Sequence, residues 1–387
     1  MQVAYFSGAL VVLQFSLSIF LIIATVIVYQ QVKYMLHKDL GMNISQVMVL
    51  ERPGKWDTAR SMHNAYVQRF RESLQHDPQI EAIGMSDELP GKAIRNPGWY
   101  QVSGTAPQAS IPIGSITIDD QFLPMLGFHF LAGRNFSRGY KTDWNGLIIT
   151  SSAVSLLGFK DSRDAIGHRL LSDGTTYPIL GVVNDFHHLS LEQRAAPTVF
   201  QYNNSDAREF EYYLIKTKSA NAVEVTRRIK ASWDEAFRNN PFDPSFLDRD
   251  FNQQYESIIR FERLFAIFAM IAIIISCIGL FSLLAFVIQQ RVKELGVRKV
   301  LGASMGDIVL LLSKDFLQLV LLANLVAWPL GGLLMNSWLK DFAYRIPIHL
   351  TVFLLSGATA LLIAVLTIGV QSAQAASTNP IKSLRTE

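Results

Sequence analysis

The chain has 387 residues, of which 50% are hydrophobic and 17% are charged, and its formal net charge is +3. This balance is too apolar for an ordinary soluble protein of that length. The net charge is too small to indicate nucleic acid as a partner, and the sequence contains no Lys/Arg-rich run with interleaved aromatic residues.

Four tracts without a charged side chain are longer than the roughly 20 residues needed to cross a bilayer. The first lacks the basic leader of a secretory signal peptide and is too long for one, so we expect it to stay in the mature protein. Cys277, the only cysteine, lies in the second tract and is expected to pack there rather than react. The tracts predict spans at about residues 8–30, 264–288, 316–338 and 350–371.

Residues 33–263, between the first and second spans, have the patterns of a mixed α+β domain. In the helical stretch 221–238, four apolar residues recur at every fourth position and predict one buried face. They are Val225, Ile229, Trp233 and Phe237. Helical spacing also occurs at 59–75, short helices with Gly-containing turns are predicted at 122–136 and 151–158, and strands are predicted at 47–50, 111–118, 146–150, 178–183 and 211–217.

Two helical segments are expected to join this domain to the membrane. Residues 29–38 can continue the first span, and residues 251–263 can lead into the second, because neither contains Gly or Pro. Such continuity predicts a stiff stalk.

Asp185, His187 and His188 lie close together in the sequence and raise the question of a metal site or a general base. Successive residues of a strand or turn point in different directions, and no second group of ligands is evident. A folded turn with polar side chains on the surface is therefore the favoured interpretation, and no metal or cofactor is predicted.

Residues 290–302, after the second span, predict a short amphipathic helix that ends at Gly302. Ser304 to Asp307 form a capping box that opens the next helix. The positive-inside rule places this basic loop and the basic tail in the cytoplasm, with the N-terminus, and residues 33–263 outside. The basic residues that normally flank a membrane span explain only the Lys and Arg residues of this segment. The apolar residues between them suit docking into a groove of another protein.

The third span contains Asn324 and the pair Trp328-Pro329, which are compatible with a kinked helix at a substrate path. A kink relieved by neighbouring helices is the favoured interpretation. In the fourth span, Ser356, Ala360 and Ala364 form a stripe of small residues typical of helix packing. The 387 residues contain no Gly-x-x-x-x-Gly-Lys-Ser/Thr phosphate loop, so any ATP must be used by a partner.

The segment after the second span resembles the coupling helix of the FtsX/MacB-type ABC-transporter permease family, with its E-x-G-x-R-K-x-x-G-A-S pattern. The tail 379–385 is similar to the ending of that family, and several landmarks resemble the MacB-type periplasmic core domain. The coupling pattern falls on Glu294, Gly296, Arg298, Lys299, Gly302, Ala303 and Ser304, and the landmarks are 126–127, 133–136, 166–167, 181–186, Pro197 and 246–248.

The resemblance implies an α+β membrane protein in a one-plus-three arrangement: span 1 at 1–32, an extracytoplasmic core domain with stalk at 33–260, and an FtsX-like three-helix domain at 261–387. It implies a non-catalytic permease subunit of a bacterial inner membrane that transmits force from a separate ATPase, for export, lipoprotein or lipid handling, or envelope signalling. The implied coupling residues are Arg291, Lys293, Glu294, Leu295, Gly296, Val297, Arg298, Lys299, Gly302, Ala303 and Ser304.

The implied partners are an ABC-type ATPase, a second copy or a homologous permease half, the lipid bilayer, and periplasmic or outer-membrane components. The chain resembles the C-terminal half of a double-length member of the family. A membrane receptor that senses a ligand outside and recruits a signalling protein inside is the alternative hypothesis. An ion-coupled secondary transporter is disfavoured, because the spans contain no charged residue.

Overall fold

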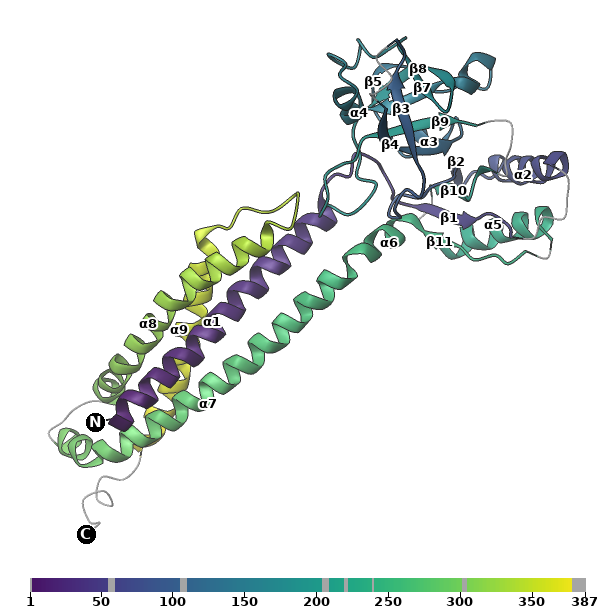
Figure 1. Ribbon diagram of the computed structural model, residues 1–387. Coiled ribbons are helices and arrows are strands. Elements are labelled where there is room, and N and C mark those ends of the chain that lie inside the picture. The colour runs from purple at the N-terminus through teal and green to yellow at the C-terminus, as the bar shows by residue number, and fades with distance from the viewer. Residues whose placement is uncertain are drawn as a thin grey trace. The chain divides into compact units, whose positions relative to one another are not determined.

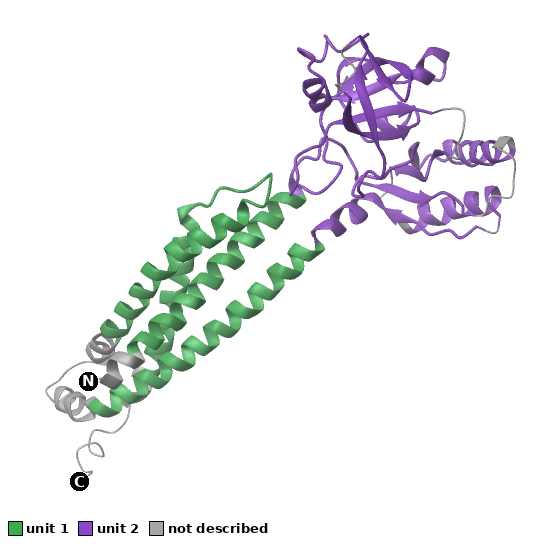
Figure 2. Cartoon of the chain, in the orientation of Figure 1, with its two compact units in different colours: residues 1–36, 256–387 green, residues 37–255 purple. Residues whose placement is uncertain are grey.

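The computed structural model describes residues 2–54, 60–104, 110–203, 209–218, 222–238, 240–300 and 305–377, with the backbone alone at 2–7, 60–61, 222, 291–300, 305–312 and 372–377. The chain forms two compact units (Figure 1). One comprises residues 1–36 and 256–387, and the other comprises residues 37–255 (Figure 2).

The first unit is a bundle of long helices: α1 (Gln2–His37), α7 (Glu256–Val300), α8 (Met305–Leu339) and α9 (Leu350–Ser377). The described residues contain four helical stretches apolar enough to cross a membrane: Gly8–His37, Leu247–Gln290, Ser313–Leu339 and Leu350–Gln371. The four predicted spans and their order are therefore confirmed. The second stretch begins in α6 (Leu247–Asn252) and the 3-10 turn η4 (Gln253–Tyr255), so helical structure leads into α7 as expected.

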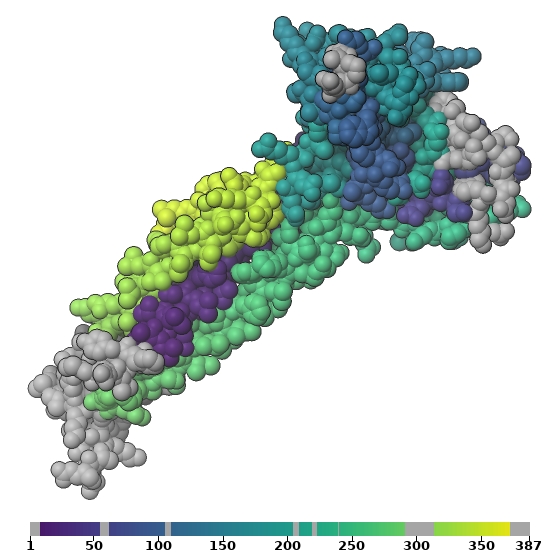
Figure 3. All heavy atoms as spheres, in the orientation of Figure 1, coloured from purple at the N-terminus to yellow at the C-terminus, as the bar shows by residue number. Residues whose placement is uncertain are grey.

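Polar side chains of α1 form hydrogen bonds with other parts of this bundle. The Oγ atoms of Ser18 and Ser276 lie 3.0 Å apart. The Gln31 side chain donates to the carbonyl of Tyr344 at 2.8 Å and accepts from the backbone N–H of Ile346 at 3.0 Å. Hydrocarbon offers no water to such groups, so internal partners stabilise the helix contacts. Figure 3 shows α1, in purple, lying along the bundle between α7 and α8.

The second unit contains a lobe in which two helices cover an antiparallel sheet. The sheet order is β11 (Ser245–Phe246), β1 (Val47–Glu51), β10 (Tyr212–Thr217) and β2 (Ile80–Ser86), and the helices are α2 (Arg60–Gln75) and α5 (Ala222–Ala236). The predicted face is confirmed, because three side chains of α5 and Phe237, directly after it, are at most 4% exposed and belong to this core.

The other lobe is a closed ring of strands. In order, it runs through β4 (Ile111–Ile118), β3 (Pro97–Val102), β7 (Arg169–Ser172), β8 (Thr175–Val183), β6 (Leu147–Thr150) and β9 (Thr198–Tyr202). The ring closes where β9 pairs in parallel with β4. Among the described strands, the sheets of the two lobes pair at Ser86 opposite Ile118. A closed ring leaves few free edges, and its inward-facing side chains form a second core.

One predicted element is confirmed only in its first part. Residues 122–136 were expected to form a short helix with a Gly-containing turn, and α3 covers Phe122–Met125 with Gly127 after it, but Phe130–Gly133 form strand β5 on β8. Gly127 has φ +70°, a left-handed conformation that ends a helix readily when the residue is glycine. The predicted helix at 151–158 is confirmed as α4 (Ser151–Leu156).

Candidate functional site

The predicted coupling segment lies at the end of α7. The eight predicted coupling residues between Arg291 and Lys299 have a helical backbone. They continue α7, which runs without interruption from Glu256, and do not form a separate helix. Their side chains, and all of Gly302, Ala303 and Ser304, lie outside the described residues. Helix α8 begins at Met305, where the capping box placed it. The docking role of this segment stays a prediction.

A loop after β8, residues 184–191, contacts the chain where it leaves α1, and we call it the junction loop. The Asn184 side chain donates to the carbonyl of Gly41 at 2.8 Å, and the His187 backbone N–H donates to the carbonyl of Leu40 at 2.8 Å. Gly41 has φ +75°, and a Cβ there would lie 2.2 Å from the carbonyl oxygen of Asp185. Only glycine permits this close approach.

The junction loop also contacts the segment that leads into α7. The backbone N–H of Leu191 donates to the Tyr255 hydroxyl at 3.2 Å. The carbonyl of His188 accepts from the N–H of Gly91 at 2.7 Å, and a Cβ at Gly91 would lie 3.2 Å from the Cα of Phe251 in α6. One loop therefore lies against both chain segments that join the α+β domain to the membrane helices.

The two histidines of the junction loop correct an expectation. They were predicted on the surface, but His187 is 8% exposed and His188 is 4% exposed. The His188 ring packs edge-on against Phe186 with centroids 5.9 Å apart, and burial lowers its pKa to about 4. Asp185 is exposed and accepts from the N–H of Ser152 at 2.7 Å. Among the described residues, no group of three candidate ligands could hold a metal ion.

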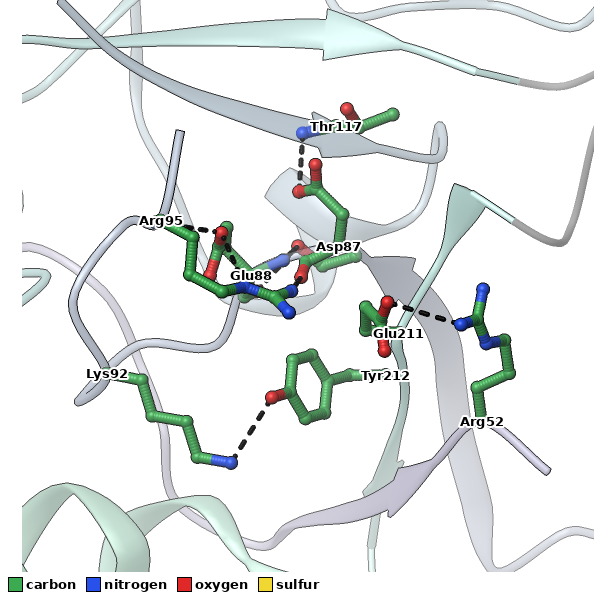
Figure 4. A network of polar contacts seen from close by, with 9 residues as sticks. Arg52, Asp87, Glu88, Lys92, Arg95, Thr117, Glu211 and Tyr212 are labelled. Carbon is green, nitrogen blue, oxygen red and sulfur yellow. Dashed lines mark hydrogen bonds and ion pairs between the residues drawn. The ribbon is translucent and has the colours of Figure 1, made fainter. Parts of the chain in front are cut away.

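Figure 4 shows a polar network on the connection between β2 and β3, the connection whose Gly91 donates to the junction loop. The Glu88 carboxylate accepts from the Arg95 backbone N–H at 3.1 Å and from its Nε at 3.2 Å. The Asp87 carboxylate accepts from the N–H of Thr117 in β4 at 2.7 Å. Burial raises the pKa of Asp87 to about 6. These contacts hold the connection against the ring of strands.

The same connection is bound to the sheet of the other lobe. Lys92, next to Gly91, donates to the Tyr212 hydroxyl at 3.2 Å and lies over that ring, 4.8 Å from its centroid. An ion pair of 3.3 Å joins Arg52 to Glu211 nearby (Figure 4). The network therefore links both lobes to the connection that contains Gly91, which contacts the junction loop. The sequence shows these residues only as a charged turn, because their partners come from distant strands.

In the bundle, the features of the third and fourth spans are packing contacts. Asn324 donates to the carbonyl of Val320 at 2.9 Å and accepts from the indole N–H of Trp328 at 3.0 Å. A Cβ at Gly357 of α9 would lie 2.4 Å from the Asn324 side-chain oxygen. The small stripe of the fourth span is buried, with Ser356 at 2%, Ala360 at 3% and Ala364 at 0% exposure. The favoured packing interpretation is supported for both spans.

Comparison with known proteins identifies the helical unit. Residues 266–380 match the model of the FtsX-like permease C-terminal family. The chain is 25% identical over 299 residues to the macrolide export ATP-binding/permease protein MacB of Bartonella henselae, covering 71% of this chain and 43% of that protein. The chain thus contains a region that matches the FtsX-like permease C-terminal family, and it is similar to MacB proteins.

Two further comparisons gave matches. The chain is 21% identical over 328 residues to MacB of Chromobacterium violaceum, covering 79% of this chain and 50% of that protein. The chain thus spans about half the length of the curated relatives it matches. The periplasmic region of MacB from Actinobacillus actinomycetemcomitans aligns with a TM-score of 0.39 and 11% identity, over 57% of this chain and 97% of that region.

Proposed function

We propose that this chain is the permease subunit of an ABC transporter and works by mechanotransmission. An ATPase outside these 387 residues hydrolyses ATP, and its closure moves the segment around Arg298. Helices α1 and α7 carry the displacement to the α+β domain, which does the work of export, lipoprotein or lipid handling, or envelope signalling. In this proposal the chain itself performs no chemical step.

The observation that carries the proposal is the double contact of the junction loop. Leu40 and Gly41 follow the end of α1 closely, and Tyr255 immediately precedes α7. Both contact the same loop through hydrogen bonds. A relative displacement of the two helix ends therefore acts on one packed element, and packed elements shift between discrete arrangements rather than deform continuously.

The length of α7 also supports the proposal. This helix has 45 residues from Glu256 to Val300. At 1.5 Å per residue it is roughly 70 Å long, more than the ~30 Å hydrocarbon core of a bilayer. A push on the segment around Arg298 can thus reach the end that follows Tyr255.

We further propose an inner-membrane location with both termini in the cytoplasm and the α+β domain on the opposite side. The four basic residues from Arg291 to Lys299 and the basic tail support this orientation through the positive-inside rule. Pairing with a second copy or a homologous half would give the two binding positions that a pair of ATPase subunits requires. The names of the relatives, which combine ATP-binding and permease parts, support an ATPase partner.

The docking step is tested by charge reversal. The full chain is purified with its P-loop ATPase, identified by mass spectrometry, and ATP hydrolysis of the complex is measured. The variant R298E/K299E should lose the ATPase. The control K340E/R345E makes the same charge change at exposed residues of the loop between α8 and α9 and should retain it. Full binding and hydrolysis by R298E/K299E would show that the docking segment lies elsewhere.

The transmission step is tested by hydrogen exchange on the assembled complex. Backbone amides of Gly91, His187 and Leu191 should change their exchange rates between the nucleotide-free and the vanadate-trapped states, because each donates a hydrogen bond at the junction. Amides inside β6 serve as the internal reference. Identical exchange at the junction in both states would contradict mechanotransmission through this loop.

A further inference from the structure

A cavity of about 250 Å³ lies in the α+β domain, at the seam between its two lobes. Helix α2 forms one wall with Arg71 and Gln68, and the segments after β4 and β5 form the other wall with Asp119, Asp120 and Arg138. At ~30 Å³ per water, this volume equals roughly eight water molecules. It is large enough for a group the size of an amino acid.

Arg71 is the more deeply buried of the two cations in this cavity wall. Its side chain is 6% exposed, and one terminal nitrogen, Nη1, lies 2.9 Å from Oδ2 of Asp119, which is 3% exposed. Among the described residues, Nε and Nη2 of Arg71 have no hydrogen-bond acceptor. These two atoms lie on the same edge of the guanidinium and present two parallel N–H groups, the arrangement that binds a carboxylate or phosphate bidentately.

Asp119 does not accept hydrogen bonds from Nε and Nη2 of Arg71. Its Oδ1 accepts from the backbone N–H groups of Met85, Gln121 and Phe122, each at 3.1 Å. These bonds fix the carboxylate at the start of α3 and leave only Oδ2 facing Arg71. Leaving a buried charged donor without an acceptor is more unfavourable than leaving a neutral one unpaired. The Nε and Nη2 edge of Arg71 therefore lacks an acceptor among the described residues, and a ligand in the cavity can supply one.

The charges around the cavity indicate which acceptor fits. Arg138 donates through Nε to Oδ1 of Asp120 at 2.7 Å, and Oδ2 of Asp120 accepts from the Gln121 side chain at 3.0 Å. The two arginines and two aspartates of the lining cancel in formal charge. The lining has no excess positive charge to pair with the second charge of a dianion. A monoanion needs only the two N–H groups of Arg71 at Nε and Nη2. Val67, Met85 and Phe210 supply an apolar wall for the rest of a ligand.

We propose that this cavity binds a small carboxylate-bearing ligand, whose two oxygens accept hydrogen bonds from Nε and Nη2 of Arg71. The ligand lies between the lobes and contacts α2 on one side and the segments after β4 and β5 on the other. Its carboxylate belongs either to a free organic acid or to the C-terminus of a peptide. The site is independent of the proposed role in force transmission.

The test uses the full chain in lipid nanodiscs and isothermal titration at pH 7. The probes are N-acetylalanine, its C-terminal amide, N-acetyl-alanyl-alanine and inorganic phosphate. A free acid should bind saturably, and the amide should bind at least tenfold more weakly because it lacks the second acceptor oxygen. Equal affinity for both acids points to a free organic acid, and binding of the dipeptide alone points to a chain terminus. Both results support the site.

Two variants and one control complete the test. R71K keeps the charge but loses the fork, so the affinity for the acid should fall at least tenfold. Gln68 is exposed and lines the cavity, so Q68W should block entry while it leaves Arg71 and Asp119 in place. R228K changes an arginine that pairs with Asp77 and should bind as the unaltered chain does. The melting temperature without ligand checks the folding of each variant.

Four results would overturn the proposal. Equal affinity for the acid and the amide would show that the carboxylate is not what the site recognises, and no binding by any probe would mean that water fills the cavity. Tighter binding of phosphate than of the acids would contradict the carboxylate assignment. Unchanged binding by Q68W would place the ligand outside this cavity, whatever the behaviour of R71K.

Discussion

The backbone N–H of His187 donates a hydrogen bond of 2.8 Å to the carbonyl oxygen of Leu40. Leu40 belongs to the segment that follows α1, and His187 belongs to the loop that follows β8. On the other side, the same loop is held by the hydroxyl of Tyr255, just before α7. Substitutions at this junction should therefore change the stability of the domain and its coupling to the helices together.

Gly41 is the most sensitive position at the junction. Alanine in its left-handed conformation costs about 1–2 kcal/mol, and the new Cβ would also lie 2.2 Å from the Asp185 carbonyl. We expect G41A to lower the melting temperature of the full chain by more than about 4 °C, since ~1 kcal/mol shifts Tm by about 2–4 °C for domains of this size.

The matched control for this change is G158A. Gly158 has φ +82°, and no described heavy atom lies within 4 Å of a Cβ built there. This variant should therefore show the conformational cost without the collision. Equal melting temperatures for G41A and G158A would contradict the close approach between Gly41 and the junction loop.

Asp87 predicts a decrease of stability with rising pH. Burial raises its pKa from 3.8 to about 6, so between these values the folded state keeps a proton that the unfolded state releases. Stability should fall as pH rises through this window and then level off. The variant D87N cannot ionise, so its melting temperature relative to the unaltered chain should increase between pH 4 and 6. A difference that stays constant across this range would contradict the buried carboxyl.

His188 predicts the opposite dependence. Burial lowers its pKa from 6.5 to about 4, so in this window the unfolded state takes up a proton that the folded state excludes. Its contribution to stability is complete above pH 6.5 and is lost as pH falls toward 4. H188F keeps an aromatic ring against Phe186 and cannot ionise, so its relative melting temperature should rise as pH is lowered. The reverse slope would show that the ring is protonated in the fold.

The orientation in the membrane is tested by labelling single cysteines. In a C277S background, W99C lies in the α+β domain, where Trp99 is 57% exposed, and R298C lies in the predicted coupling segment. A membrane-impermeant maleimide should label W99C in intact spheroplasts and R298C only after permeabilisation. Labelling of both from one side would disprove the orientation and the transmission model with it.

The sequence determined the four spans and the helical face of α5. A span depends on the hydropathy of about 20 consecutive residues and satisfies its own backbone hydrogen bonds, so no distant partner is needed. Likewise, Val225, Ile229 and Trp233 follow helical periodicity, and all three are buried. Local patterns of this kind show which nearby residues are apolar, and this is enough to predict a helix and the face that it buries.

Only the tertiary structure decided what those faces pack against. The parallel pairing of Gly114 with Thr198, which closes the ring of strands, joins segments that no local pattern connects. The burial of His188 and the free edge of Arg71 were likewise hidden, because the sequence predicts polar side chains on the surface and cannot show an enclosing neighbour. Hydropathy and periodicity depend on near neighbours along the chain, whereas the junction and the cavity depend on contacts between residues far apart in it.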